Sequence, residues 1–231
     1  MFTRHSNPVP GASPRRLAIS LVAGLYISGV LALGTLPLRA AEPSNVMPDK
    51  AAAGDQALGV PSGTYGLDKT HGYITFGYSH LGFSNPEVGF NDFDVALTLD
   101  AQAPQNSTFD VVIQAASIDS RVAKFDEHLI GPDYFDVATH KTIRFVSSAI
   151  QMTSANTADI TGTLTLKGQS HPVTLSAVLN KAGIHPLARV PALGVSASAT
   201  LKRSQWGLDK YVPMVSDEVE VRIEIELPKA K

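Results

Sequence analysis

The sequence predicts an all-β fold, an eight-stranded antiparallel barrel with one short helix. The first observation is the segment Val219–Leu227, V-E-V-R-I-E-I-E-L, in which apolar and charged residues alternate for nine positions. A period of two puts the apolar side chains on one face of a strand and the charges on the other. The second observation is that similar alternation recurs elsewhere, in Phe93–Leu99, Phe109–Ala115, Ile160–Leu166, Val173–Leu179 and Val195–Leu201. The third is that a single segment, Val122–Leu129, reads clearly as a helix.

The first 40 residues predict an export signal. Arg4, Arg15 and Arg16 supply a positive start, and Leu17–Leu38 then runs 22 residues without a charge. Ala40 followed by Ala41 offers a cleavage site, but the apolar stretch is also long enough to span a bilayer as an uncleaved anchor helix. The Arg15-Arg16 pair leaves both the Sec and the twin-Arg export routes open. Export predicts a periplasmic protein, with inner-membrane anchoring as the alternative.

Residues 41–63 are rich in Ala, Pro, Gly and Asp. They show neither the apolar alternation of a strand nor the apolar spacing of a helix, so they are predicted to form a flexible linker. The folded domain is predicted to span residues 64–228. In its first half we expect strands over residues 73–80, 87–100 and 109–115, with Gly89 marking a bulge or a sharp bend. The helix over residues 122–129 ends at Gly131-Pro132.

In the second half of the domain, strands alternate with short turns. Residues 167–170, Lys-Gly-Gln-Ser, predict a hairpin turn, and residues 182–193, rich in Gly and Pro, predict a loop. The expected strands are residues 142–151, 158–167, 172–179, 194–203 and 215–227.

Alternation fits a two-sheet sandwich as well as a barrel. A barrel is favoured because closure removes exposed strand edges. Eight strands enclose either a side-chain core or one small ligand. Small residues at apolar-face positions favour a cavity, namely Ala115, Ala177, Ala197 and Ala199.

Composition excludes several classes of function. There is no cysteine, which excludes disulfides, thiol catalysis and iron–sulfur clusters. Without the four arginines of residues 1–40, 15 basic residues stand against 21 acidic ones, a net charge of −6. An acidic domain argues against nucleic acid as a partner. The histidines lack metal-ligand spacing, so no metal site is predicted.

Catalysis is not predicted either. No G-x-S-x-G or S-x-x-K arrangement is present, and the adjacent acids of Asp126-Glu127 and Asp217-Glu218 are poor acid–base partners. An enzyme acting on a lipid-like substrate through His80 or His128 stays open as an alternative, without evidence for a reaction type. Six aromatic residues fall between Tyr73 and Phe93, and five more between Phe109 and Phe145. They predict either a core or the lining of a tunnel for a long apolar chain.

The same segments resemble the YceI family of bacterial polyisoprenoid-binding domains, from about Thr64 to Leu227. The resemblance is carried by short motifs in the family's order: residues 65–68 (Y-G-L-D), 76–84 (F-G-Y-S-H-L-G-F-S), 116–120 (A-S-I-D-S), 126–129 (D-E-H-L), 133–136 (D-Y-F-D), 143–145 (I-R-F), 162–168 (G-T-L-T-L-K-G), 172–175 (P-V-T-L), 203–207 (R-S-Q-W-G) and 216–219 (S-D-E-V). Two positions depart from the family pattern, because Lys202 and Gln205 stand where Asn and Asp are usual.

The resemblance implies a lipocalin-like eight-stranded barrel in the periplasm. It also implies a long-chain isoprenoid lipid, such as an isoprenoid quinone or polyprenyl lipid, as the partner in the lumen. It implies carriage or storage without established catalysis, and transient contact with the inner membrane. We expect ligand-binding residues at Phe76, Tyr78, His80, Leu81, Phe83, Phe93, Phe109, Ile113, His128, Leu129, Phe135, Phe145, Arg203 and Trp206.

Within this set, His128, Leu129 and Phe135 are expected to cover one end of the barrel. Arg203 either braces the barrel end or faces a polar head group. The competing hypothesis is a ligand-free barrel or sandwich that serves as an interaction or stress-protection module. Such a module would have an interior fully packed by side chains. The sequence leaves the oligomeric state open, a homodimer included.

Overall fold

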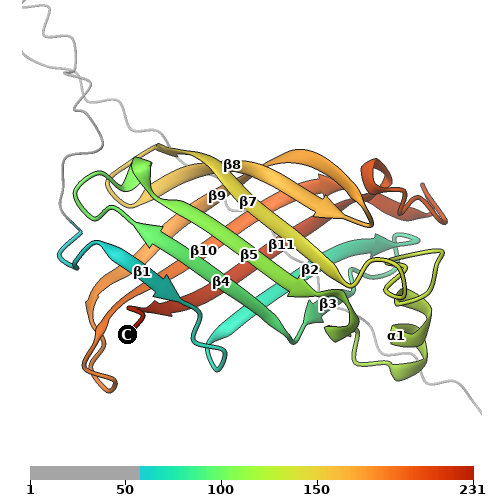
Figure 1. The fold of residues 1–231 in the computed structure, drawn as a ribbon. Helices are drawn as coiled ribbons and strands as arrows, with labels where there is room; N and C mark the ends of the chain where they lie inside the picture. Colours follow the sequence, from blue (N-terminus) through green and yellow to red (C-terminus); the bar gives the residue numbers. More distant parts are fainter. Residues whose placement is uncertain (1–57) are drawn as a thin grey trace, which may run out of the picture. The chain divides into compact units, whose positions relative to one another are not determined.

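The computed structural model describes residues 58–231 (Figure 1). The predicted signal or anchor helix, residues 1–40, and residues 41–57 of the predicted linker lie outside the described residues. Among residues 58–231, no helix combines the length and the apolar character needed to cross a membrane.

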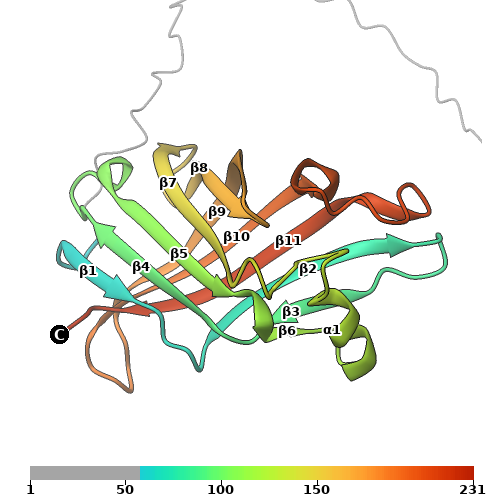
Figure 2. The same ribbon diagram turned by 45° about the vertical axis from the view of Figure 1, so that its right-hand side comes forward.

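The described residues form one antiparallel sheet of eleven strands that curls into a barrel-like wall (Figures 1 and 2). Along the sheet the order is β1-β4-β5-β7-β8-β9-β10-β11-β2-β3-β6. The strands are β1 (Gly63–Gly66), β2 (Gly72–His80), β3 (Glu87–Phe90), β4 (Phe93–Leu99), β5 (Thr108–Gln114), β6 (Ile118–Asp119), β7 (Thr142–Met152), β8 (Thr157–Leu166), β9 (Gln169–Ile184), β10 (Pro191–Lys202) and β11 (Val215–Pro228).

Eleven strands stand where the sequence predicts eight, because the predicted stretch 87–100 is divided into β3 and β4, and because β1 and β6 are short strands that were not predicted. Residues 67–71 separate β1 from β2, Asn91-Asp92 separate β3 from β4, and the 3-10 helix η2 (Ala115–Ser117) separates β5 from β6. The predicted bulge at Gly89 is wrong, because Gly89 pairs in register with Thr75 of β2 and Asp119 of β6. The break lies two residues later, where the exposed Asn91 side chain donates a hydrogen bond to Asp119 (3.1 Å).

Pairing between the first and last long strands curls the sheet round on itself. β11 pairs with β2 from Val215–His80 to Ile225–Gly72. At the other end, Tyr65 of β1 forms an isolated bridge with Lys229, just after β11. These contacts cover backbone groups that would otherwise form exposed edges.

The alternation predicted for the strands is confirmed by the burial pattern. In β4, Phe93, Val95, Leu97 and Leu99 are buried while the residues between them are exposed. β4 therefore presents one apolar face to the interior, as the period of two requires, and β11 follows the same pattern from Val219 to Leu227.

The β8–β9 hairpin turn is also confirmed. Lys167 and Gly168 both have positive φ, +50° and +73°. Two consecutive residues with positive φ form a tight two-residue hairpin turn whose twist matches that of the flanking strands. Glycine adopts a positive φ at no steric cost.

The loop predicted over residues 182–193 is shorter in the structure. β9 continues to Ile184 and β10 already begins at Pro191, so residues 185–190 form the connection. Proline lacks an N–H donor but is tolerated as the first residue of a strand. Gly183 pairs with Ala192, and the ladder therefore extends beyond the point where composition alone predicts a turn.

Residues 58–63, the end of the predicted linker, are part of the folded domain. Val60 is buried, and the Leu58 backbone N–H donates to the Ala101 carbonyl at 3.1 Å. Two apolar side chains in a polar segment were sufficient to anchor it against the core.

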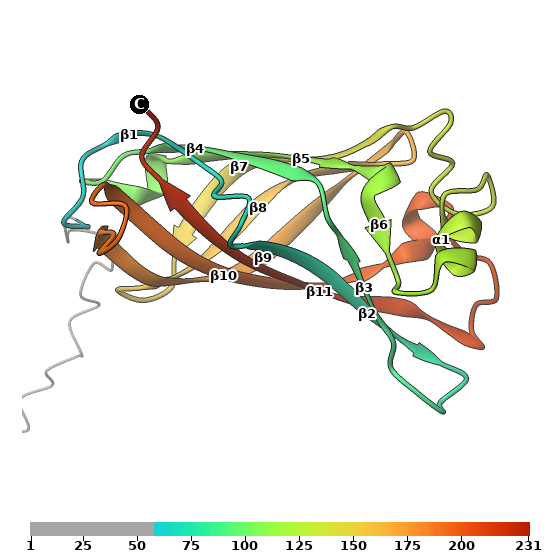
Figure 3. The same cartoon turned by 90° about the horizontal axis from the view of Figure 1, so that it is seen from below.

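The predicted helix is confirmed as α1 (Ala123–Leu129), and it covers one end of the barrel (Figure 3). Leu129 is its buried residue, and Asp126 accepts a hydrogen bond from the Ser120 backbone N–H at 2.7 Å. The 3-10 helix η3 (Arg203–Trp206) follows β10 and buries Trp206. A third short turn, η1 (Pro104–Asn106), links β4 to β5.

Candidate functional site

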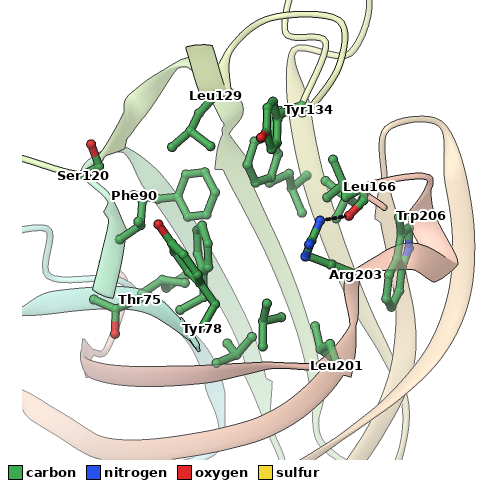
Figure 4. A pocket seen from close by; sticks show the side chains of 18 of the residues that line it. Thr75, Tyr78, Phe90, Ser120, Leu129, Tyr134, Leu166, Leu201, Arg203 and Trp206 are labelled. Atoms are coloured by element: carbon green, nitrogen blue, oxygen red, sulfur yellow. Dashed lines mark hydrogen bonds between the residues drawn. The ribbon is translucent and has the colours of Figure 1, made fainter. Parts of the chain in front are cut away.

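A cavity of about 620 Å³ occupies the end of the barrel near α1 and η3 (Figure 4). This volume lies within the range of small-molecule sites, roughly 300–1,000 Å³. Its outermost lining residues His80, Val122 and Tyr211 are exposed, so the cavity opens to solvent at this end. Much of its wall is aliphatic and comes from the inward faces of eight strands, with Ile74, Val88, Val111, Ile113, Ile143, Leu164, Leu166, Val173, Leu175, Leu201, Val219, Val221 and Ile223.

Three phenylalanines pack together in one wall of the cavity. The ring centroids of Phe76 and Phe90 are 5.9 Å apart, those of Phe76 and Phe135 6.3 Å, and those of Phe90 and Phe135 5.8 Å. Phe76 and Phe90 lie on the paired strands β2 and β3, whereas Phe135 follows α1. This cluster ties the segment that carries the helix to the barrel wall.

Two tyrosines place hydroxyl groups on this otherwise apolar surface (Figure 4). Tyr78 lies on β2, and Tyr134 follows α1. Burial raises the pKa of both hydroxyls above the ordinary tyrosine value, so both remain protonated donors near neutral pH. Within the described residues, neither hydroxyl has a hydrogen-bond partner, which leaves both free for a ligand.

The guanidinium of Arg203 reaches the cavity wall but is engaged by the backbone. It donates to the carbonyl oxygens of Ser216 (2.8 Å), Lys210 (3.0 Å) and Val215 (3.0 Å), and also to that of Leu208. Arg203 therefore braces the segment between η3 and β11. Of the two roles open from the sequence, these contacts favour the structural one.

The other cation at the cavity is also paired. The Lys210 ammonium contacts a carboxylate oxygen of Asp133, and this hydrogen bond holds the pKa of the Asp133 carboxyl below its usual value. Neighbouring Ser204 donates its backbone N–H and its hydroxyl to the two Asp217 carboxylate oxygens, both at 2.8 Å. Asp217 of β11 thus supplies a partner for Ser204 although Gln205 replaces the usual Asp of the motif.

The two histidines weighed as catalytic candidates lie at the mouth. His80 ends β2, and His128 of α1 packs its ring 4.9 Å from that of Tyr134. In residues 58–231, neither imidazole forms a hydrogen bond or an ion pair with a carboxylate. Neither is therefore arranged as the base of a charge-relay pair.

The structure brings most of the predicted site residues together around the cavity. Their contribution to ligand binding stays a prediction. The predicted residues that line it are Phe76, Tyr78, His80, Ile113, His128, Leu129, Phe135, Phe145, Arg203 and Trp206.

Four predicted residues lie elsewhere. Leu81 and Phe83 are exposed, Phe83 to 90%, because Leu81 and Gly82 adopt positive φ and turn the chain away from the wall. Phe93 is buried in the core outside the cavity. Phe109 lines a separate void of about 80 Å³ toward the opposite end of the barrel.

Sequence reasoning missed several lining residues that it could have found. Val219, Val221 and Ile223 occupy the apolar face of the most regular alternating segment. Phe90 and Tyr134 belong to the aromatic cluster that the sequence displays. Leu208 and Tyr211 gave no signal, because they lie in an irregular segment between η3 and β11.

A polar cluster on the outside of the barrel joins residues distant in sequence. Ligand-type atoms of Asp68, His71 and Glu226 all lie within 4.8 Å of one another, although no spacing predicted it. None of the three lines the cavity. Asp68 accepts from the Thr70 hydroxyl (2.7 Å) and lies 3.0 Å from Nδ1 of His71. Hydrogen bonds from Thr70, then from His71, lower the pKa of Asp68 to about 2.

We expect His71 to titrate above the ordinary histidine value, because its hydrogen bond to Asp68 raises its pKa. The protonated His71 stabilises the fold through its hydrogen bond to Asp68. This stabilisation is complete below about pH 6.5 and is lost as the pH rises through the pKa of His71 in the folded state. The Asp68 contribution is present above about pH 4 and is lost as the pH falls toward its lowered pKa. NMR titration of Asp68→Asn should show a lower His71 pKa than in the wild type. An unchanged pKa would contradict the assigned hydrogen bond.

Comparison with known proteins gives a consistent result. The model of the YceI-like domain family matches residues 65–227. A UPF0312 protein of Ectopseudomonas mendocina is 35% identical over 178 residues, which cover 76% of this chain and 91% of the relative. A UPF0312 protein of Pseudomonas aeruginosa is 37% identical over 164 residues, 70% of this chain and 85% of the relative.

Solved structures share the fold at lower identity. Burkholderia cenocepacia BcnA aligns with a TM-score of 0.63 and 23% identity, over 69% of this chain and 98% of BcnA. A Campylobacter jejuni YCEI protein aligns with a TM-score of 0.61 and 24% identity, over 66% and 90% of the two chains. A polyisoprenoid binding domain from Saccharophagus degradans aligns with a TM-score of 0.54 and 14% identity, over 74% of this chain and 100% of that domain.

Proposed function

Because this chain belongs to the YceI-like domain family, we propose that it is a periplasmic protein that binds and carries a polyisoprenoid lipid in its cavity. The observation that carries the proposal is the apolar cavity of about 620 Å³ inside a wall whose outer face is polar. Such a cavity supports this function over a ligand-free module, whose interior would be packed at normal protein density. The name of the Saccharophagus degradans neighbour points in the same direction.

An isoprenoid tail suits this lining energetically. Each buried CH₂ contributes roughly 0.8 kcal/mol, so a five-carbon isoprene unit contributes on the order of 4 kcal/mol before ordering costs. Several units therefore allow tight binding without a charged anchor. The phenylalanine cluster of Phe76, Phe90 and Phe135 provides flat surfaces for such a chain.

The polar groups of the cavity favour a neutral head group, such as that of an isoprenoid quinone, over a polyprenyl phosphate. Among the described residues, the lining groups without a hydrogen-bond partner include the hydroxyls of Tyr78 and Tyr134 and the imidazoles of His80 and His128 at the mouth. The Arg203 guanidinium is engaged by backbone carbonyls and Lys210 by Asp133. A phosphate entering the apolar cavity without an unpaired lysine or arginine would lose hydration with little replacement. A quinone carbonyl needs only a hydrogen-bond donor.

The direct experiment is to purify the exported protein, extract it with organic solvent and identify long-chain lipids by mass spectrometry. We expect an isoprenoid lipid in stoichiometric amount, and uptake of a quinone analogue by the delipidated protein. Absence of any long-chain lipid together with no uptake would refute the proposal. Cell fractionation of the full chain, with and without residues 1–40, tests the periplasmic location.

Carriage also requires transfer from a membrane, and the apolar residues around the mouth support transient membrane contact. Leu81, Phe83, Tyr211 and Met214 are at least half exposed and lie on the two segments that meet beside His80. Side chains of this kind insert into the interfacial region of a bilayer.

We expect Phe83→Ser to slow uptake of a quinone from lipid vesicles several-fold and to leave the affinity for a soluble short-tailed analogue unchanged. Leu187→Ser is the matched control, because Leu187 is similarly exposed, 87% against 90%, but lies in the β9–β10 loop at the opposite end of the barrel (Figure 1). Stopped-flow fluorescence measures the rate. Equal rates for the two variants would remove the argument for contact through the mouth.

A further inference from the structure

Two voids lie toward opposite ends of the barrel interior. The large cavity of about 620 Å³ lies toward α1, and the void of about 80 Å³ lies toward the opposite end. On β5, Val111 lines the large cavity, and the preceding inward-facing residue, Phe109, lines the small void. On β9, Leu175 and Ala177 are divided in the same way. On β5 and β9 no inward-facing position lies between the two linings, so the voids approach each other most closely at these strands. On β10, Ala197 and Ala199 lie between Leu201 of the large cavity and Val195 of the small void.

Phe145 is the bulkiest side chain on the large-cavity side of this approach. Val111, Phe145, Leu164 and Leu175 all line the large cavity, and of these four Phe145 alone is aromatic. It pairs with Val111 on one side and Leu164 on the other, and it is 7% exposed.

Gly162 fixes the place of the Phe145 ring. Gly162 faces inward on β8 between Leu164, which lines the large cavity, and Ile160, which lines the small void. A Cβ atom at Gly162 would lie 2.5 Å from Cζ of Phe145 and 2.4 Å from the Val146 carbonyl oxygen. The ring therefore occupies the volume that any other side chain at position 162 would fill. A close-packed ring of this kind forms a defined surface.

We propose that Phe145, seated on Gly162, is the specificity-determining residue that sets the maximum length of the bound tail. The end of the tail stops at the Phe145 ring, and further carbon atoms stay outside the protein. This inference rests on the proposed function, since it concerns the tail of the lipid that the cavity takes. Beyond the ring lies the small void, whose lining is mostly apolar and would accept more of the tail if the ring were absent.

The test measures the affinity of the delipidated protein for quinones that share one head group and carry increasing numbers of isoprene units. For the wild type, we expect affinity to rise with each unit and then to stop rising at one length. In Phe145→Ala that limit should move to longer tails. The first tail beyond the wild-type limit should bind on the order of tenfold more tightly to the variant.

Ile143→Ala is the matched control. Ile143 is buried on the same face of β7 and also lines the large cavity, but it lies one inward position nearer the mouth. Its truncation enlarges the cavity without joining the voids, so the length limit should stay where it is. Phe145→Leu, which keeps most of the volume, replaces Phe145→Ala if the latter does not fold, and it should move the limit less.

A second variant tests the role of the small void directly. Ala177→Leu fills that void, so in the Phe145→Ala background it should move the limit back toward the wild-type length. An unchanged limit in both Phe145 variants would overturn the inference while leaving lipid binding intact. If the wild type bound no member of the series, the proposed function itself would fail. The two failures are therefore distinguishable.

Discussion

Phe76→Asp is expected to lower the affinity for an isoprenoid quinone by at least about 100-fold, or about 2.7 kcal/mol. Phe76 lies on β2 in the middle of the phenylalanine cluster and lines the cavity. A carboxylate there either carries water into the apolar interior or becomes protonated at a free-energy cost. Both outcomes weaken the binding of an apolar tail.

Phe83→Asp is the control, since Phe83 is exposed and does not line the cavity. Its affinity for a soluble analogue should equal that of the wild type. Trp206 is the single tryptophan of the chain and lines the cavity. Quenching of its fluorescence during a ligand titration measures the dissociation constants of both variants. Circular dichroism establishes that each variant is folded.

A second variant separates the loss of binding from loss of fold. Val221→Phe fills the cavity from β11 with an apolar ring, without introducing a charge. It should also weaken binding, while the protein unfolds at a similar or higher temperature. Retention of full affinity in both Phe76→Asp and Val221→Phe would mean that the lipid binds elsewhere.

Arg203→Ala is expected to destabilise the fold by about 2 to 4 kcal/mol, which lowers Tm by roughly 5 to 15 °C. The Arg203 guanidinium donates to four backbone carbonyls between Leu208 and Ser216. Without it, those carbonyls lose their charged partner, and the segment that forms one side of the mouth loses its brace. Denaturant unfolding followed by far-UV circular dichroism measures the change.

Arg203→Lys should rescue little of this stability. An ammonium group lacks the planar fork with which the guanidinium reaches several carbonyls at once. If Arg203 instead held an anionic head group, Arg203→Lys would keep much of the binding and Arg203→Ala would remain stable. The opposite pattern, loss of stability in both variants, is the one expected from the geometry.

Much of the fold follows from local pattern. Alternation in residues 93–99 and 219–227 predicted strands whose apolar residues all face the interior, because a strand repeats every two residues. The hairpin at Lys167-Gly168 and the helix ended by Gly131-Pro132 follow from the backbone preferences of glycine and proline. These signals are short-range and need no knowledge of the partner strand.

The errors arise where distant contacts decide. Composition predicted a linker up to residue 63, but Val60 finds a place in the core. The family resemblance implied that Leu81 and Phe83 line the ligand pocket, yet the turn at Gly82 places them outside the wall. The cluster of Asp68, His71 and Glu226 forms only because β11 ends beside the β1–β2 connection.

The sequence by itself determined an all-β domain whose strands have one apolar face, and it predicts an export signal before that domain. Only the tertiary structure decided that the apolar faces enclose an open volume, which residues line it, and that the Phe145 ring packs against Gly162. The reason is physical: period and turn chemistry are properties of neighbouring residues, whereas a cavity depends on how side chains from strands far apart in sequence fill a common space.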